Sequence, residues 1–249
     1  MQIHSRHTEN QARWVWTKGL QTMEQQEIAV TIPWFEHDSR DQLLTDLLRF
    51  IETYLTKQLK HILPGQTLSY GWSILRFVAD EQNLSGVGSG TLLIEERQNA
   101  FSQEHPTYVS GVTRTLALLQ VQNEAMQRNR VTGASIYPHA SQQALMCTRV
   151  TPETIHRLHP LKADRAWQPD GKNSGWCIGC CDEDHDHDNP HELTRIHLFH
   201  LAESFPAVFP YLAMPVGTMV LFEEHQAIVF RLHEGDGQID PGSLLSSLP

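Results

Sequence analysis

The segment 172–188 constrains this chain more than any other, because it crowds metal-binding and acidic side chains into one short span. It contains three cysteines, two histidines, four aspartates and one glutamate, and a turn-forming Ser174-Gly175-Trp176 lies near its start. Thiolates and imidazoles are ligands that zinc prefers, whereas a run of acidic residues is typical of a solvated loop. Two interpretations stay open: a small domain with a metal ion, or a binding domain whose acidic loop faces a partner.

The metal interpretation depends on Cys177 and Cys180, whose Cys-x-x-Cys spacing suits one half of a tetrahedral zinc site. His185 and His187 are candidate ligands for the other half, because side chains two residues apart share one face of a strand. No second pair completes a recognised spacing unambiguously. The residues therefore predict a loop without a cofactor, in which Cys177 and Cys180 are ordinary strand or turn residues, and leave zinc binding as the alternative.

Composition and charge narrow the class of protein. The chain has 249 residues, of which 40% are hydrophobic, enough for substantial cores. Its formal net charge of −10 argues against a nucleic-acid partner, which needs a clustered basic face, and permits a basic protein partner. The N-terminus lacks the apolar core of a signal peptide, and no apolar run approaches the length of a membrane span. We expect a cytoplasmic protein that contacts no membrane.

Hydrophobic spacing predicts an α+β protein. Apolar residues three and four apart indicate helices, and short alternating runs bounded by glycine or proline indicate strands. The predicted helices cover about 39–59, 111–130 and 193–204, and the first half of 111–130 could equally be a strand. The predicted strands cover about 27–33, 67–78, 91–95, 146–150, 216–222 and 227–232. We expect two domains, each a mostly antiparallel sheet packed with helices.

The domain boundaries follow from a change in composition. Residues 151–171 are rich in histidine, proline and aspartate with little hydrophobic periodicity, which is typical of a linker. The chain is therefore divided into an N-terminal domain of unknown role at 1–150, a linker at 151–171 and a C-terminal domain at 172–249.

Catalytic motifs are absent from the sequence. It contains no nucleophile elbow and no Walker or Rossmann fingerprint, and the glycines at 86–90 lack the spacing and the helix of a phosphate-binding loop. A thiolate at Cys181 would be disfavoured by the acidic residues beside it. We expect a protein that is not an enzyme and has no catalytic residues.

Several pieces of the second half occur in the order typical of one known family. Ser174-Gly175-Trp176 precedes the acidic residues 182–184, and the proline-rich run 205–218 precedes a strand that ends at Phe222-Glu223. Residues 172–231 thereby resemble a bacterial immunity-protein domain, first catalogued as a domain of unknown function and found beside polymorphic-toxin genes. The leucine-rich helix and the residues 65–72 resemble the N-terminal companion region of longer members. The chain departs from the family at Cys180, Cys181 and the His/Asp alternation.

The resemblance implies that this chain binds and neutralises a cognate secreted toxin, by occlusion and without turnover. An acidic loop beside an aromatic anchor suits a basic partner, because tight interfaces combine such anchors with charged rims. Tryptophans of this kind are more often core residues than partner anchors, and core packing is the favoured role for Trp176 as well. The proline-rich run can equally be a binding surface or a cover for a core. The candidate partner-binding residues are Trp176, Asp182, Glu183, Asp184, Asp186, Asp188 and Tyr211.

Overall fold

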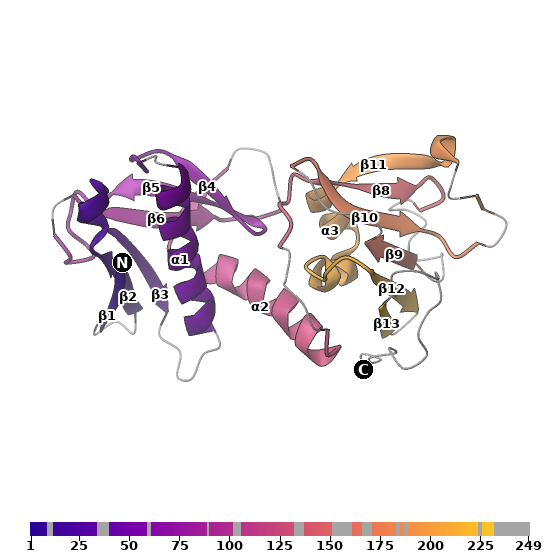
Figure 1. The fold of residues 1–249 in the computed structure, drawn as a ribbon, viewed down its shortest axis with the longest axis horizontal. Helices are drawn as coiled ribbons and strands as arrows, with labels where there is room; N and C mark the ends of the chain where they lie inside the picture. The colour runs from indigo at the N-terminus through magenta and orange to yellow at the C-terminus, as the bar shows by residue number, and fades with distance from the viewer. Residues whose placement is uncertain are drawn as a thin grey trace. The chain divides into compact units, whose positions relative to one another are not determined.

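The chain forms two compact units, Met1–Gln120 and Val121–Pro249, in a computed structural model (Figure 1). The structure describes residues 1–8, 12–33, 40–58, 61–88, 90–101, 106–131, 137–150, 161–165, 171–182, 185–186, 189–223 and 226–231. For residues 161–165 it describes the backbone alone. Both units combine strands with helices, so the predicted α+β class is confirmed.

The first unit contains a seven-stranded sheet of order β1-β2-β3-β6-β5-β4, with β7 also paired to β6. The described strand pairs are antiparallel except for β3 and β6, which run parallel. The strands are β1 Gln2–His7, β2 Ala12–Lys18, β3 Ile28–Pro33, β4 Thr67–Tyr70, β5 Ser73–Ala79, β6 Leu92–Arg97 and β7 Tyr108–Ser110.

The burial of these strands follows their sequence. In β5, alternate residues Ser73, Leu75 and Phe77 are buried, as expected for a strand with one face on the core. In β3, a central strand, Ile28, Ala29 and Val30 are buried consecutively, as in a strand covered on both faces. The run 67–78, predicted as one strand, is a hairpin of β4 and β5 that turns at Gly71, whose φ is 54°.

Two long helices match the predicted spacing. Helix α1, Arg40–Gln58, buries leucines and isoleucines three and four residues apart, which include Leu44, Leu47 and Ile51. Helix α2, Thr113–Arg128, contains the boundary between the two units. None of the helices in the described ranges has the apolar length that a bilayer crossing requires.

The second unit contains a six-stranded sheet of order β11-β8-β10-β9-β12-β13. The described pairs are antiparallel except for β8 and β10, which are parallel neighbours. The strands are β8 Gln143–Cys147, β9 Leu161–Arg165, β10 Asn173–Gly179, β11 Leu193–His197, β12 Thr218–Glu223 and β13 Gln226–Arg231, and helix α3 spans Leu198–Ser204. A short 3-10 helix, Pro206–Tyr211, follows α3.

Three features of the second unit differ from the sequence-based expectation. The predicted helix over 193–204 begins as strand β11, which pairs with β8 before the chain turns into α3. Strand β9 lies within the predicted linker and pairs with both β10 and β12. Strand β8, assigned to the N-terminal domain, belongs to the second sheet. The predicted hairpin of β12 and β13 is confirmed.

Candidate functional site

Two cysteines meet at the ends of the parallel strands β8 and β10. Cys147 is the last residue of β8, and Cys180 directly follows β10. The register pairs Ile178 with Met146, so the segments that follow the two strands leave the sheet at the same edge. The Sγ atoms of Cys147 and Cys180 lie 3.7 Å apart, and the two residues are only 0% and 3% exposed. Neither cysteine forms a disulfide.

His185 completes a cluster of three buried side chains. Its backbone N–H donates to the carbonyl oxygen of Asp182 at 3.2 Å. The Nδ1 atom of His185 lies 3.0 Å from the Cys147 Sγ and 3.2 Å from the Cys180 Sγ. One atom from each of these three side chains lies within 4.8 Å of the others, and this is the group of metal-ligand type that the described residues form.

A carboxylate and a backbone N–H support this cluster from outside. The Nε2 atom of His185 lies 3.2 Å from Oε2 of Glu192, which also accepts a hydrogen bond from the Thr148 hydroxyl. The backbone N–H of Arg149 donates to the Cys147 Sγ at 3.3 Å, and its guanidinium pairs with Asp182. Each ring nitrogen of the imidazole therefore faces a defined neighbour.

The electrostatics follow from burial and these hydrogen bonds. Burial raises the pKa of the Cys180 thiol above its ordinary value, mainly because a thiolate loses its hydration there. The hydrogen bond from His185 lowers the pKa of Glu192, and the one from Thr148 adds to this effect. These shifts favour a neutral thiol at Cys180 and an ionised carboxylate at Glu192.

The structure separates the residues of the predicted metal site. Cys180 and His185 belong to the cluster, but Cys177 does not. Cys177 lies within β10 and is half-buried, between the buried Trp176 and Ile178. Its position in the strand directs its side chain to the opposite face from these two neighbours. His187 lies outside the described residues.

Cys147 was not predicted as a member of the site. It lies 33 positions before Cys180 and outside any Cys-x-x-Cys or His-x-His spacing. A parallel alignment of the strands before the two cysteines is the signal that brings them together, and hydrophobic alternation alone does not reveal which strands pair.

Trp176 and Tyr211 are core residues, which corrects their predicted role as partner contacts. They are 1% and 2% exposed, and neither side chain can reach a partner without opening the unit. The Trp176 indole Nε1–H donates to the carbonyl oxygen of Leu212 at 3.0 Å. The Tyr211 ring packs edge-on against Phe222, with 5.5 Å between ring centroids.

A bulge in β10 turns Trp176 into the core. The pairing of β10 with β8 shifts register between Asn173 and Cys177, and Gly175 there has a φ of 79°. The Ser174 hydroxyl donates to the carbonyl oxygen of Gln143 at 2.9 Å and accepts the backbone N–H of Trp176 at 3.3 Å. The Ser-Gly-Trp motif is therefore a structural device of the sheet.

The acidic residues of the loop are only partly described. Asp182 and Asp186 are exposed, beside the buried cluster. Glu183, Asp184 and Asp188 lie outside the described residues. The two described carboxylates thus satisfy the exposure that a partner contact requires.

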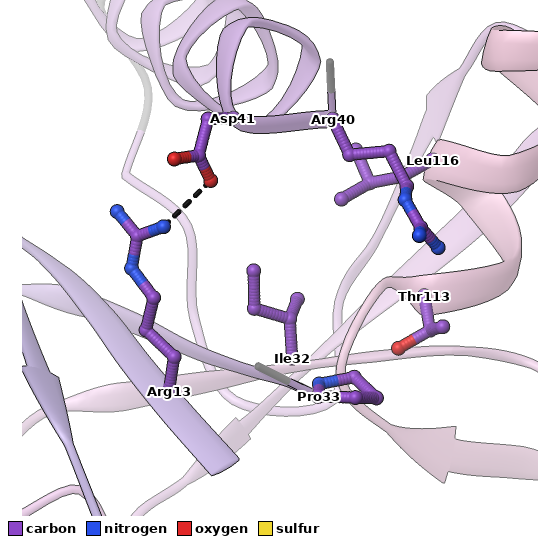
Figure 2. Close-up of a pocket in the computed structure, with 7 residues that line it drawn as sticks. All are labelled: Arg13, Ile32, Pro33, Arg40, Asp41, Thr113 and Leu116. Carbon is purple, nitrogen blue, oxygen red and sulfur yellow. Dashed lines mark hydrogen bonds and ion pairs between the residues drawn. The ribbon is translucent and has the colours of Figure 1, made fainter. Parts of the chain in front are cut away.

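A hollow in the first unit is too small for a ligand. Ile32 and Pro33 of β3 line it together with the first residues of α1 and α2. In Figure 2 the Arg13 guanidinium and the Asp41 carboxylate point toward one another, 2.6 Å apart, at one side of this hollow. Its volume of about 10 Å³ is room for about one water molecule.

Comparison with known proteins identifies the second unit. Residues 122–231 match the family model described as the Imm33-like domain, an immunity-protein family. The match begins one residue after the start of the second unit and ends with the last residue of β13. No curated protein and no solved structure gives a significant match to the chain. The immunity-type resemblance of the C-terminal half is therefore confirmed: residues 122–231 form an Imm33-like domain.

Proposed function

We propose that this chain is a cytoplasmic immunity protein whose second unit binds a cognate toxin protein and neutralises it by covering the toxin's active site. The observation that carries this proposal is the match of residues 122–231 to the Imm33-like domain. Binding alone is enough for protection, because a toxin whose active site is covered cannot reach its substrate. We therefore propose stoichiometric inhibition without turnover.

The acidic loop at 182–188 supports a basic partner surface. Asp182 and Asp186 are exposed, and the whole chain has a formal net charge of −10. Complementary charge accelerates the encounter of two proteins and disfavours partners of the wrong sign. A toxin that cleaves nucleic acid needs a basic cleft, so we propose this class of toxin as the partner.

The buried aromatic residues limit the partner surface. Trp176 and Tyr211 cannot serve as anchors, since both are buried in the second unit. The contact is therefore proposed to depend on the loop's carboxylates, and its strength should fall steeply with salt because exposed charges are screened.

Co-expression with the product of the neighbouring gene, as the candidate toxin, tests the function. We expect the chain to restore growth of cells that make the toxin, and the two purified proteins to form a complex. Titration of toxin activity should reach full inhibition at a one-to-one ratio. Protection without a complex, or inhibition at far below one equivalent, would contradict neutralisation by occlusion.

A loop variant tests the contact separately. Alanine at all five acidic positions, 182, 183, 184, 186 and 188, is expected to weaken toxin binding and its salt dependence together. The control variant carries alanine in place of Glu203 and Glu223, two exposed carboxylates on α3 and β12 of the same unit, and should bind the toxin as the wild type does. Full protection by the five-alanine variant would remove the loop from the interface, while leaving the immunity function itself intact.

A further inference from the structure

The buried cluster at the edge of the second sheet has the donors and the spacing of a metal site. Two sulfurs bound to one zinc ion at about 2.3 Å in a tetrahedron lie about 3.8 Å apart. The Sγ atoms of Cys147 and Cys180 are separated by 3.7 Å. A disulfide would require about 2.05 Å, so this separation fits a shared ion better than a sulfur–sulfur bond.

The Nδ1 atom of His185 faces both sulfurs, as a third ligand of the same ion would. This atom is 3.0 Å from one Sγ and 3.2 Å from the other, so it faces both thiols almost equally. A tetrahedral zinc ion would hold that nitrogen about 3.6 Å from each sulfur, a movement of about half an ångström that a small rotation of His185 provides. A neutral Nδ1 accepts one thiol hydrogen at a time, whereas a single ion would be bound by the nitrogen and both sulfurs together.

The surroundings of the cluster are those of a metal-binding histidine. The Glu192 carboxylate accepts a hydrogen bond from Nε2 of His185. This places the ring proton on Nε2 and leaves the Nδ1 lone pair for an ion. The backbone N–H of Arg149 donates to the Cys147 Sγ and stabilises negative charge on that sulfur. The three side chains are at most 7% exposed, so they are shielded from competing water.

We propose that Cys147, Cys180 and His185 bind one zinc ion, whose fourth position is taken by an oxygen or nitrogen donor. Soft thiolates together with imidazole select zinc over magnesium and calcium, which prefer oxygen. The site joins the ends of β8 and β10 to the chain at His185, directly beside the exposed Asp182 and Asp186. Its role is to hold the start of the acidic loop against the sheet. This inference does not depend on toxin binding.

Metal content is measured on the full chain without a histidine tag and in a reductant that does not bind metal. We expect one zinc per chain. When a chelator has removed the zinc and cobalt is added, we expect a thiolate-to-metal charge-transfer band. X-ray absorption at the zinc edge should count two sulfur ligands. The melting temperature should fall on chelation and recover when zinc is added back.

Five single variants test the assignment of the ligands. Cys147→Ser and Cys180→Ser are each expected to lose zinc and the charge-transfer band, whereas Cys177→Ser keeps both because Cys177 lies outside the cluster. Glu192→Gln leaves all ligands in place and is expected to weaken zinc affinity about 10–100-fold. Glu203→Gln, on the exposed side of α3, is its control and should leave the zinc affinity unchanged. The comparison of these two glutamate variants tests the site even if the cysteine variants fail to fold.

Several results would overturn the proposal. It fails if the untagged protein contains no stoichiometric metal and cobalt gives no charge-transfer band. It fails equally if the double variant Cys147→Ser/Cys180→Ser retains zinc, or if three or four sulfurs surround the ion. If unfolding the protein without reductant exposes only two of its four thiols, the pair Cys147 and Cys180 must be tested as a disulfide, and its detection by mass spectrometry contradicts the zinc site.

Discussion

The Sγ atom of Cys147 lies 3.7 Å from that of Cys180, although the two cysteines are 33 positions apart in the chain. The parallel pairing of β8 with β10 produces this proximity, because the two strands end at the same edge of the sheet. The Ser174-Gly175-Trp176 motif lies in the same strand β10, where a bulge directs the indole into the core. Four predictions follow, three on the core and the bulge of the second unit and one on a buried carboxylate of the first unit.

Replacing Trp176 by Phe should destabilise the second unit. The substitution removes the indole N–H that donates to the Leu212 carbonyl oxygen, and with it one buried hydrogen bond of the core. We expect the free energy of unfolding to fall by about 1–3 kcal/mol. Urea unfolding measures this change, with Val121→Ala at a 41% exposed position as the control that should change by less than about 0.5 kcal/mol. An unchanged Trp176→Phe protein would contradict the structural role of the indole.

Replacing Gly175 by Ala should strain the bulge. Gly175 has a φ of 79°, and a side chain with a Cβ costs about 1–2 kcal/mol in that conformation. Gly171→Ala is the matched control, because no atom lies within 4 Å of the Cβ it would add and its backbone is outside the left-handed region. Thermal unfolding of both variants should show a lower melting temperature for Gly175→Ala alone. Equal melting temperatures would mean that the bulge does not need glycine.

Replacing Tyr211 by Phe should leave the protein as stable as before or more stable by up to about 1 kcal/mol. The Tyr211 hydroxyl is buried and has no hydrogen-bond partner among the described residues, so its removal abolishes a desolvation cost. Burial also raises the pKa of this phenol. Tyr137→Phe is the opposite control, since its hydroxyl donates to Asn123 and its loss should cost about 1 kcal/mol. Chemical denaturation of both variants decides, and a clear loss in Tyr211→Phe would reveal a hidden partner.

Replacing Glu96 by Gln should change how stability varies with pH. The carboxylate of Glu96 accepts the backbone N–H groups of Arg114 and Thr115 at the start of α2. Burial nevertheless raises its pKa above the usual 4.5, outweighing these hydrogen bonds. Because the folded-state pKa is the higher one, the stabilisation from Glu96 is complete below the unfolded pKa and is lost as pH rises through the folded pKa.

The neutral amide introduced by Glu96→Gln resembles the protonated acid at every pH. The variant should therefore gain stability relative to the wild type as pH rises from about 4 to 7, by about 1.4 kcal/mol for each unit of the pKa difference. Urea unfolding at several pH values measures this gain. Glu203→Gln controls for the loss of one surface carboxylate. A gain that shrinks with rising pH would show that the hydrogen bonds to α2 outweigh burial.

Local patterns in the sequence were enough to predict the long helices and the last hairpin. The regular burial of Leu44, Leu47 and Ile51 follows directly from their spacing in α1. The same kind of spacing gave a wrong prediction at 193–197, because Leu193 and Ile196 suit a helix as well as a strand. Pairing of Leu193 with Cys147 and of Ile196 with Ala144 favours the strand, and this tertiary contact is invisible to a local pattern.

The candidate site was only half predictable for a related reason. Cys180 and His185 share one short segment, so their spacing already suggested a ligand pair. The third member, Cys147, comes from a strand whose partner is chosen by the whole sheet. Trp176 was assigned to either core or interface from sequence, and its burial decides for the core.

The order of strands in the second sheet has a consequence for synthesis on the ribosome. Strand β8 emerges before both of its neighbours, since β10 and β11 follow it in the chain. Non-local pairing of this kind is slow, because a long loop must close before any contact forms. The nascent chain therefore exposes the thiol of Cys147 until β10 and His185, more than 30 positions later, have been translated.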